Sequence, residues 1–161
     1  MEANSVAPSL LDRLTDFEPK NKKESAHAAH ISPRRMREIL KRDISWLLAT
    51  IRLEELVDLE KHDAIRSSVL NYGVRDMSGV PEQNINPHEV QETIRGALCK
   101  YEPRFDPSTV HVQLLDPSEL ETRGLVKMRI TGQLLMPGYE ELIHLEAKIN
   151  FETGSIALED G

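Results

Sequence analysis

The sequence is poor in the residue types on which much small-protein chemistry depends. Its 161 residues include one cysteine, Cys99, and no run of 18 apolar residues. One cysteine cannot form an internal disulfide or a thiolate metal cage, which favours a reducing, cytoplasmic compartment. The apolar runs are too short to span a membrane, and the N-terminal residues lack the basic and apolar regions of a secretory signal. We therefore expect no membrane insertion and no disulfide framework.

Basic and aromatic residues are also scarce in most of the chain. Residues 1–43 carry 9 Lys/Arg and 7 Asp/Glu, residues 44–161 carry 11 and 20, and the net charge is −7. Binding to nucleic acid needs a basic surface that neutralises phosphates. Base stacking needs aromatic side chains, and these make up only 4% of the chain. The composition argues against nucleic acid as a partner.

Catalytic motifs are missing as well. The sequence has no GxSxG, no P-loop and no GxGxxG, and its six histidines lack the neighbours of a metal site. His27 and His30 have helical spacing but lie in a polar segment. Cys99 fits a structural thiol better than a nucleophile. A carboxylate pair for glycan cleavage stays open, since the sequence singles none out. We predict no enzyme, no cofactor, no metal and no small-molecule substrate.

Residues 1–31 are predicted to be a leader and a flexible linker, ahead of a single domain at 32–161. A short docking helix is expected at 9–16, and it must dock on something to be ordered. The polar segment 17–31 fits a mobile linker. A frayed terminus is the competing hypothesis for the leader. Three leucines at helical spacing motivate the docking helix: Leu10, Leu11 and Leu14.

Three helical segments are predicted in the domain. Ser32-Pro33 caps the first, the second covers 63–71, and Asn86-Pro87 with Glu89 begins the third, which Pro103 ends. The expected buried positions are Met36, Leu40, Ile44, Leu47, Leu48 and Ile51 in the first helix, Ile65, Val69 and Tyr72 in the second, and Val90, Ile94, Ala97, Leu98 and Tyr101 in the third. The basic residues of the first helix are interpreted as a solvated face: Arg34, Arg35, Arg37, Lys41 and Arg42.

From residue 110 onward the hydrophobic period changes from 3.6 to 2. Strands are predicted at 110–114, 125–136, 142–151 and 155–158, with turns at Pro137-Gly138 and Thr153-Gly154. Helices followed by a meander predict an α+β fold, with N-terminal helices on one face of an antiparallel sheet in two layers. The expected core joins Leu40, Ile44, Leu47 and Leu48 to Val126, Met128, Ile130, Leu145, Ala147 and Ile149.

The segment Glu102-Pro103-Arg104 breaks a local rule. It follows a helix C-terminus, where the backbone dipole favours Arg104 and disfavours Glu102. The extended geometry expected around Pro103 would place both charged side chains on one side. A surface ion pair worth about 0–1 kcal/mol is one hypothesis. A recognition motif is the other, because functional sites often violate local rules.

The chain resembles the TssE family, the small baseplate subunit of the bacterial type VI secretion system, over residues 9–16 and about 36–158. That family is related to baseplate-wedge proteins of contractile phage tails, some of which carry a lysozyme-like label. The resemblance rests on an ordered set of motifs: Ser9-Leu-Leu-Asp-Arg-Leu14, Arg42-Asp-Ile-Ser-Trp-Leu-Leu48, Ser68-Val-Leu-Asn-Tyr-Gly73, Asp76-Met-Ser-Gly79, Tyr101-Glu-Pro-Arg104 and Asn150-Phe-Glu-Thr-Gly154.

The resemblance implies a non-enzymatic subunit in the cytoplasm, within a baseplate docked to the inner-membrane complex. Glu102, Pro103 and Arg104 would contact the core bundle of the two larger wedge subunits. The same subunit would help to start sheath assembly by accepting strands from the first sheath ring, and an open sheet edge would permit this. Two other hypotheses remain: an adaptor or anti-adaptor that binds a regulator through the same fold, and a lysozyme-like glycan-cleaving enzyme.

Overall fold

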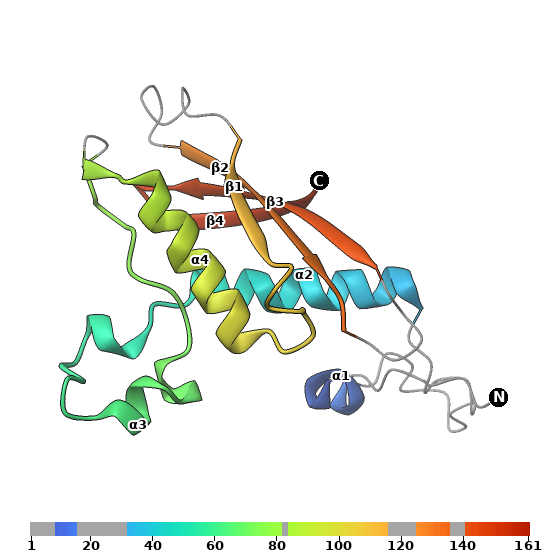
Figure 1. Ribbon diagram of the computed structural model, residues 1–161, viewed down its shortest axis with the longest axis horizontal. Helices are drawn as coiled ribbons and strands as arrows, with labels where there is room; N and C mark the ends of the chain where they lie inside the picture. Colours follow the sequence, from blue (N-terminus) through green and yellow to red (C-terminus); the bar gives the residue numbers. More distant parts are fainter. Residues whose placement is uncertain (1–8, 16–31, 82–83, 116–124, 136–140) are drawn as a thin grey trace.

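The protein is seen in a computed structural model that describes residues 9–15, 32–81, 84–115, 125–135 and 141–161. Four strands form one antiparallel sheet in the order β1-β2-β3-β4, and two long helices pack against it (Figure 1). The predicted α+β fold is confirmed. The elements are α1 (Leu10–Leu14), α2 (Pro33–Ala49), η2 (Leu53–Glu55), α3 (Asp63–Arg66), η3 (Val69–Asn71), α4 (Pro87–Tyr101), β1 (His111–Leu114), β2 (Leu125–Gln133), β3 (Leu142–Asn150) and β4 (Ser155–Asp160).

Helices α2 and α4 begin at the capping residues that the sequence predicts. The Ser32 hydroxyl accepts the backbone N–H of Arg35 at 3.2 Å, and Pro33 fills the first helical position. The Asn86 side chain accepts the N–H of His88 at 3.1 Å, with Pro87 next in the chain. These caps satisfy donors that have no partner within the helix.

The hydrophobic core lies between the two long helices and one face of the sheet. Alternate residues of β2 and β3 are buried, and their neighbours are more exposed, so the second face of the sheet meets solvent. The predicted packing is confirmed, because a single buried cluster joins both layers: Leu40, Ile44, Leu47 and Leu48 of α2 with Val126, Met128, Ile130, Leu145, Ala147 and Ile149 of the sheet.

The prediction of one helix over 63–71 is wrong. The chain instead forms α3 and the short 3₁₀ helix η3, and Val69, expected inside, is 77% exposed. Two serines explain the break. The Ser67 hydroxyl donates to the Asp63 carbonyl at 2.8 Å, and the Ser68 hydroxyl accepts the N–H of Leu70 at 3.1 Å. Such side chains compete with helical backbone bonds.

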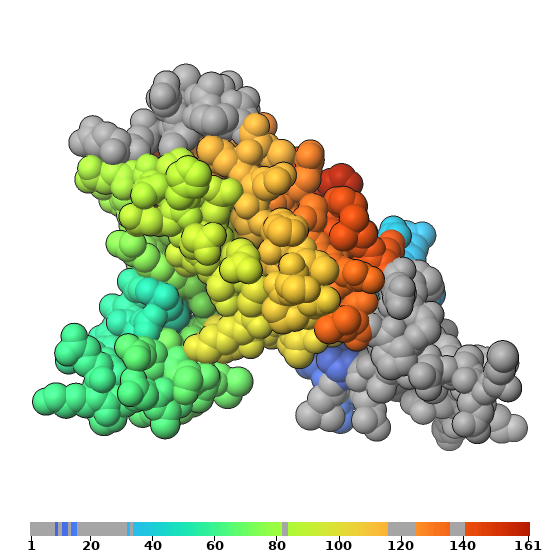
Figure 2. All heavy atoms as spheres, in the orientation of Figure 1, coloured from blue at the N-terminus to red at the C-terminus, as the bar shows by residue number. Residues whose placement is uncertain are grey.

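Ile51 is also not on the buried face of α2, because the helix ends at Ala49 and Ile51 is exposed. It forms an isolated parallel bridge with Val74. Gly73 allows the two segments to lie this close, because a Cβ at this position would lie 2.2 Å from the Thr50 carbonyl oxygen. Its φ of +122° is also a conformation that favours glycine. The stretch from η2 to η3 forms a lobe on one side of the sheet (Figure 2).

The strand boundaries differ modestly from those predicted. Strand β2 ends at Gln133 and β3 at Asn150, whereas β4 continues to Asp160, beyond the predicted end at 158. The additional length of β4 pairs with β3 as far as Leu145. The linker at 17–31 and the predicted Pro137-Gly138 turn lie outside the described residues.

The two edges of the sheet differ in their backbone hydrogen bonds. At the β1 edge, the carbonyl of Val112 accepts from the Gln91 side chain of α4 at 2.9 Å. The carbonyl of Val110, just before β1, accepts from Arg95 at 3.3 Å. Helix α4 therefore covers outward-facing groups at this edge.

The β4 edge is open within the described part of the chain. Gly161 donates its N–H to the His144 carbonyl at 3.3 Å, which sets the alternation of the β3–β4 ladder. In this register, the backbone groups of Ile156, Leu158 and Asp160 point away from β3. No described residue bonds to these outward groups.

Candidate interaction site

The Glu102-Pro103-Arg104 segment forms a tight turn directly after α4. Glu102 is the C-cap residue, its N–H bonds to the Leu98 carbonyl, and its own carbonyl accepts the N–H of Phe105 at 3.2 Å. Pro103 therefore occupies the second position of a hydrogen-bonded turn, where its fixed φ is favoured. The expectation of extended geometry around Pro103 is wrong, although the two charged side chains do meet.

The turn is fixed to the end of β2. Leu135 donates its N–H to the Arg104 carbonyl at 2.7 Å, and Asp106 donates to the Gln133 carbonyl at 2.9 Å. Between these bonds the buried Phe105 ring lies against Gly132, where a Cβ would come within 2.9 Å of the ring. These contacts hold the backbone of the turn in one position.

Glu102 and Arg104 form a partly buried ion pair with two-pronged geometry. Glu102 is only 5% exposed. The Arg104 Nε donates to Glu102 Oε1 at 2.6 Å, the Nη2 donates to Oε2, and the Arg104 backbone N–H also donates to Oε1 at 3.2 Å. Burial lowers the pKa of Arg104, but the bonds and charges of Glu102 and Asp43 together raise it above its ordinary value. The surface-pair hypothesis does not fit this burial.

Asp43 of α2 approaches the same guanidinium from the other layer of the fold. Its Oδ2 accepts from Arg104 Nη2 at 2.8 Å. Its Oδ1 accepts from the neighbouring Arg42, with Nε at 2.9 Å and Nη2 at 2.7 Å. Burial, and then the charges of Asp43 and Glu102, raise the pKa of Tyr72. One carboxylate therefore connects two arginines.

Arg42 extends the network to the leader. Its Nη1 donates to Asp12 Oδ1 of α1 at 2.7 Å, and its Nη2 lies 3.3 Å from Oδ2. The bond from Arg42 lowers the pKa of Asp12, and the Ser9 hydroxyl, also bonded to Asp12, lowers it further. The bond to Asp12 in turn raises the pKa of Arg42. The guanidinium of Arg42 also stacks on Trp46, 4.9 Å from the ring centroid.

Helix α1 thus contacts the domain through Asp12, while leucines of the leader face outward. Leu11 is 47% exposed and Leu14 is 74% exposed, and the side chain of Leu10 lies outside the description. Figure 1 shows α1 below the end of β2, close to α2. The structure brings together the two segments that the sequence singled out, the leader and the Glu102–Arg104 turn.

Sequence reasoning missed the residues that connect these segments. The interpretation of Arg42 as part of a solvated basic face is wrong, since it pairs with Asp12 and Asp43. The other basic residues of that face are also paired: Arg34 and Arg35 with Glu38, Arg37 with Glu141, and Lys41 with Asp160. The adjacent opposite charges of Arg42 and Asp43 could have indicated this role. Both side chains lie off the apolar face of α2, so each can also pair with a charged group on another element.

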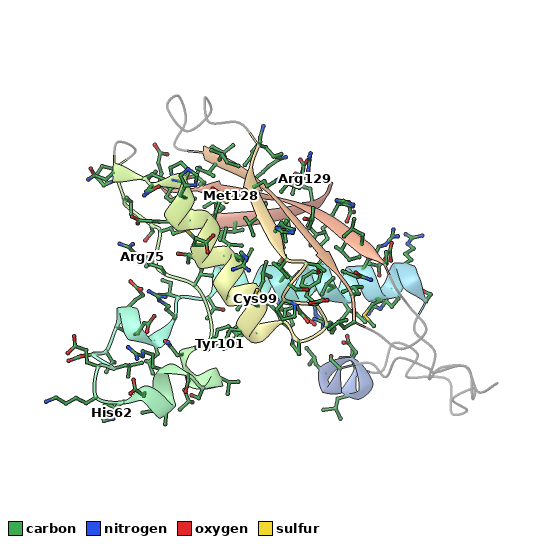
Figure 3. The ribbon with its side chains drawn as sticks, in the orientation of Figure 1. His62, Arg75, Cys99, Tyr101, Met128 and Arg129 are labelled. Atoms are coloured by element: carbon green, nitrogen blue, oxygen red, sulfur yellow. The ribbon has the colours of Figure 1, made fainter. Side chains whose placement is uncertain are left out.

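The described residues offer neither a metal site nor a membrane-spanning helix. They contain no group of three His, Cys, Asp or Glu side chains arranged to hold a metal ion. None of their helices has the length and apolarity needed to cross a bilayer. Figure 3 shows Cys99 on α4, and its thiol lies 3.8 Å from the Pro107 carbonyl oxygen. The ion-pair network is the site that the geometry favours.

Comparison with known proteins identifies the class. The family described as "Baseplate wedge protein gp25" matches residues 34–138, which is more than half of the chain. The chain belongs to this family of baseplate wedge proteins, which includes the TssE subunits. The match covers α2, α4 and the Glu102–Arg104 turn. The comparisons find no match among curated proteins or solved structures. A structural role in the baseplate of a contractile tail follows from the family.

Proposed function

We propose that the protein is the TssE-type wedge subunit of a type VI secretion baseplate. In this role it joins the core bundle of the two larger wedge subunits to the first ring of the sheath, and it catalyses no reaction. The baseplate would lie in the cytoplasm, docked to the inner-membrane complex. The observation that carries this proposal is the family match at residues 34–138, which includes the Glu102–Arg104 turn with its buried Glu102.

The larger wedge subunits are proposed to bind at Glu102, Pro103 and Arg104 and at the leader leucines. Two features support this assignment. The turn is held rigidly, so a partner would not have to order it. The Nη1 of Arg104 makes no hydrogen bond to any described residue, so it can donate to a partner. Leu11 and Leu14 of α1 offer exposed apolar area, and Leu10 belongs to the same proposed site.

The sheath is proposed to bind by strand addition at the β4 edge. Strand addition requires a row of outward N–H and C=O groups. Ile156, Leu158 and Asp160 present such groups without a partner among the described residues. The β1 edge is less suitable, because α4 side chains already bond to Val110 and Val112. Among the edges described, β4 is therefore the acceptor.

Co-purification of the full chain with the two larger wedge subunits tests the first contact. The Arg104→Lys variant keeps the positive charge but loses the planar geometry that holds Glu102. We expect it to melt as a folded protein and to recover at least about tenfold less of the larger subunits, and Arg75→Lys, at an exposed arginine, is the matched control. Full recovery with Arg104→Lys would contradict the assignment of the turn.

Proline substitutions in β4 test the second contact. Leu158 directs its N–H outward, so Leu158→Pro removes no bond to β3, whereas Ala157→Pro does. Leu158→Ala controls for the lost side-chain packing. We expect Leu158→Pro, and not Leu158→Ala, to stop sheath assembly while binding to the larger wedge subunits persists. Normal sheaths with folded Leu158→Pro would exclude the β4 edge as the acceptor.

A further inference from the structure

We propose that the lobe from η2 to η3, residues 53–71, is a separate docking surface that binds a basic, amphipathic segment of another protein. The inference goes beyond the proposed function, because it uses neither the Glu102–Arg104 turn, nor the leader, nor the β4 edge. Its apolar part is the lobe patch, which consists of Leu56, Val57, Val69 and Leu70.

The lobe exposes much apolar surface for its size. Ten large apolar side chains are exposed among the described residues, and the four of the lobe patch are among them, with exposed fractions from 50% at Val57 to 77% at Val69. Leu59 is the only apolar residue of the lobe that is buried. Single exposed apolar residues are ordinary, whereas a group of them rimmed by polar residues is typical of a protein interaction site.

Hydrogen bonds hold η2 and η3 together and fix η3 to α4. Asn71 is 3% exposed, its Oδ1 accepts the N–H of Glu54 at 3.0 Å, and its Nδ2 donates to the Arg66 carbonyl at 3.2 Å. From α4, the Tyr101 hydroxyl donates to the Asn71 carbonyl, and the Lys100 Nζ donates to the Arg66 carbonyl at 2.8 Å. Figure 3 shows Tyr101 at the end of α4 nearer the lobe. A partner therefore meets a surface that is already ordered.

The charge of the lobe indicates a basic partner. Residues 53–71 contain two basic and five acidic residues, a net charge of −3: Lys61 and Arg66 against Glu54, Glu55, Asp58, Glu60 and Asp63. Arg66 is already bonded to Asp63 at 2.7 Å, and Asp58 and Glu60 form no ion pair with a described residue. Lysine or arginine beside the apolar face of a partner segment would complement these carboxylates.

The same charge makes other occupants less suitable. An acidic surface repels nucleic acid and anionic lipid. A second copy of this chain would have to offer basic side chains, but those of α2 already pair within the chain: Arg34 and Arg35 with Glu38, Arg37 with Glu141, and Lys41 with Asp160. A basic segment of a different protein is therefore the occupant.

A hollow of about 180 Å³ between the lobe and α4 lets the partner approach closely. Its lining includes Glu54 of η2, Asn71 of η3 and Gly96 of α4. Gly96 lies inside α4, where glycine is less favourable than alanine, and a Cβ at this position would meet no atom within 4 Å. Packing within the described chain does not require glycine there, whereas close approach of a partner would.

Binding of a labelled model peptide to the full chain tests the partner chemistry. The probe is an amphipathic helix of leucine and lysine about 18 residues long, and the control peptide carries glutamate in place of lysine. We expect the lysine peptide to bind at least about tenfold more tightly than the glutamate peptide. Equal binding of the two peptides would overturn the proposal.

Substitutions in the lobe patch locate the binding site. Leu56→Ser/Leu70→Ser should weaken binding of the lysine peptide at least about tenfold, with a melting temperature within about 2 °C of wild type because both side chains are exposed. Leu142→Ser, at a side chain of β3 that is 55% exposed, is the matched control and should leave binding unchanged. Equal loss in both variants, or no loss in either, would overturn the assignment to the lobe.

A substitution at Gly96 tests the hollow. Glutamine favours the helix more than glycine, so Gly96→Gln should melt at or above the wild-type temperature, and its side chain would occupy the hollow. We expect its affinity for the lysine peptide to fall at least about fivefold, so that stability and binding change in opposite directions. Unchanged affinity would overturn the role of the hollow.

Two further measurements separate this proposal from the others. Leu56→Ser/Leu70→Ser should still co-purify with the larger wedge subunits, and loss of these subunits would overturn a surface separate from the proposed wedge contact. A wild-type chain that does not bind them would overturn the wedge function and leave the peptide result standing. Sedimentation tests the second copy as occupant: a wild-type dimer that the same substitutions dissociate would overturn the basic partner.

Discussion

The Oδ2 of Asp43 lies 2.8 Å from the Nη2 of Arg104, although 61 residues separate them in the chain. This contact connects the middle of α2 to the turn after α4. It places a second carboxylate beside a guanidinium that already pairs with the buried Glu102. The site is therefore a part of the folded core as well as a surface for partners.

Removal of the arginine alone is expected to destabilise the protein. Arg104→Ala leaves the Glu102 carboxylate buried without its main partner, which should lower the free energy of unfolding by about 2–4 kcal/mol. The double substitution Glu102→Leu/Arg104→Met removes both charges and should recover much of the loss. Urea denaturation of both variants measures this. Equal stability of wild type and Arg104→Ala would show that the pair contributes little to folding.

Acid is expected to release the leader helix before it unfolds the domain. The bond from Arg42 holds the pKa of Asp12 below its ordinary value of about 3.9. A lowered carboxyl pKa stabilises the docked state above the unfolded pKa, and this contribution is lost as the pH falls through the folded pKa. Quenching of Trp46 should therefore rise below about pH 4 while far-ultraviolet circular dichroism changes little. Asp12→Asn should show the raised quenching already at neutral pH, without the acid step.

The close approach of Gly73 to Thr50 predicts a sensitive position beside the site. Gly73→Ala should cost at least about 2 kcal/mol, because the new Cβ would overlap a backbone oxygen and the positive φ is unfavourable. Gly79→Ala also has a positive φ but meets no atom within 4 Å, so it should cost only about 1 kcal/mol. Thermal melts that rank the two variants equally would contradict this account.

The core assignment of α2 has a direct check. Leu47 is buried in the cluster between α2 and the sheet, so Leu47→Ala should lower stability by about 2–5 kcal/mol. Val69→Ala removes a similar kind of side chain from a position that is largely exposed, and it should change stability by less than about 0.5 kcal/mol. Chemical denaturation of both variants gives the comparison. A small effect at Leu47 would contradict its place in the core.

The fold was largely predictable because its signals are local. Caps at Ser32 and Asn86 and the alternation in residues 125–150 depend on near neighbours in the sequence. The break at Ser67-Ser68 was missed because serine side chains offered the backbone a competing set of bonds. The division of the chain at 31/32 stays a prediction.

Only two parts of the candidate site, the leader leucines and the Glu102–Arg104 segment, could be predicted from the sequence. Glu102 is an acidic residue at a helix C-terminus, where the backbone dipole disfavours it, and the leader leucines are apolar residues next to a polar segment. Both departures from the local pattern could be recognised in the sequence. Asp12, Arg42 and Asp43 obeyed every local rule, and their role depends on contacts across 30 and 61 residues. Such contacts are set by how α1 and α2 pack, which the pattern of one sequence does not specify.

The unequal edges of the sheet have a consequence for growth by strand addition. A sheet with two open edges can be extended without limit at both edges, because each added copy exposes a new edge. Here α4 side chains bond to the carbonyl groups of Val110 and Val112 at the β1 edge, whereas no described residue bonds to the outward backbone groups of β4. Under the proposed strand addition, growth from this sheet would therefore start at the β4 edge. In the proposed role, the molecule would begin a series of added strands at one edge and would not extend the series at both.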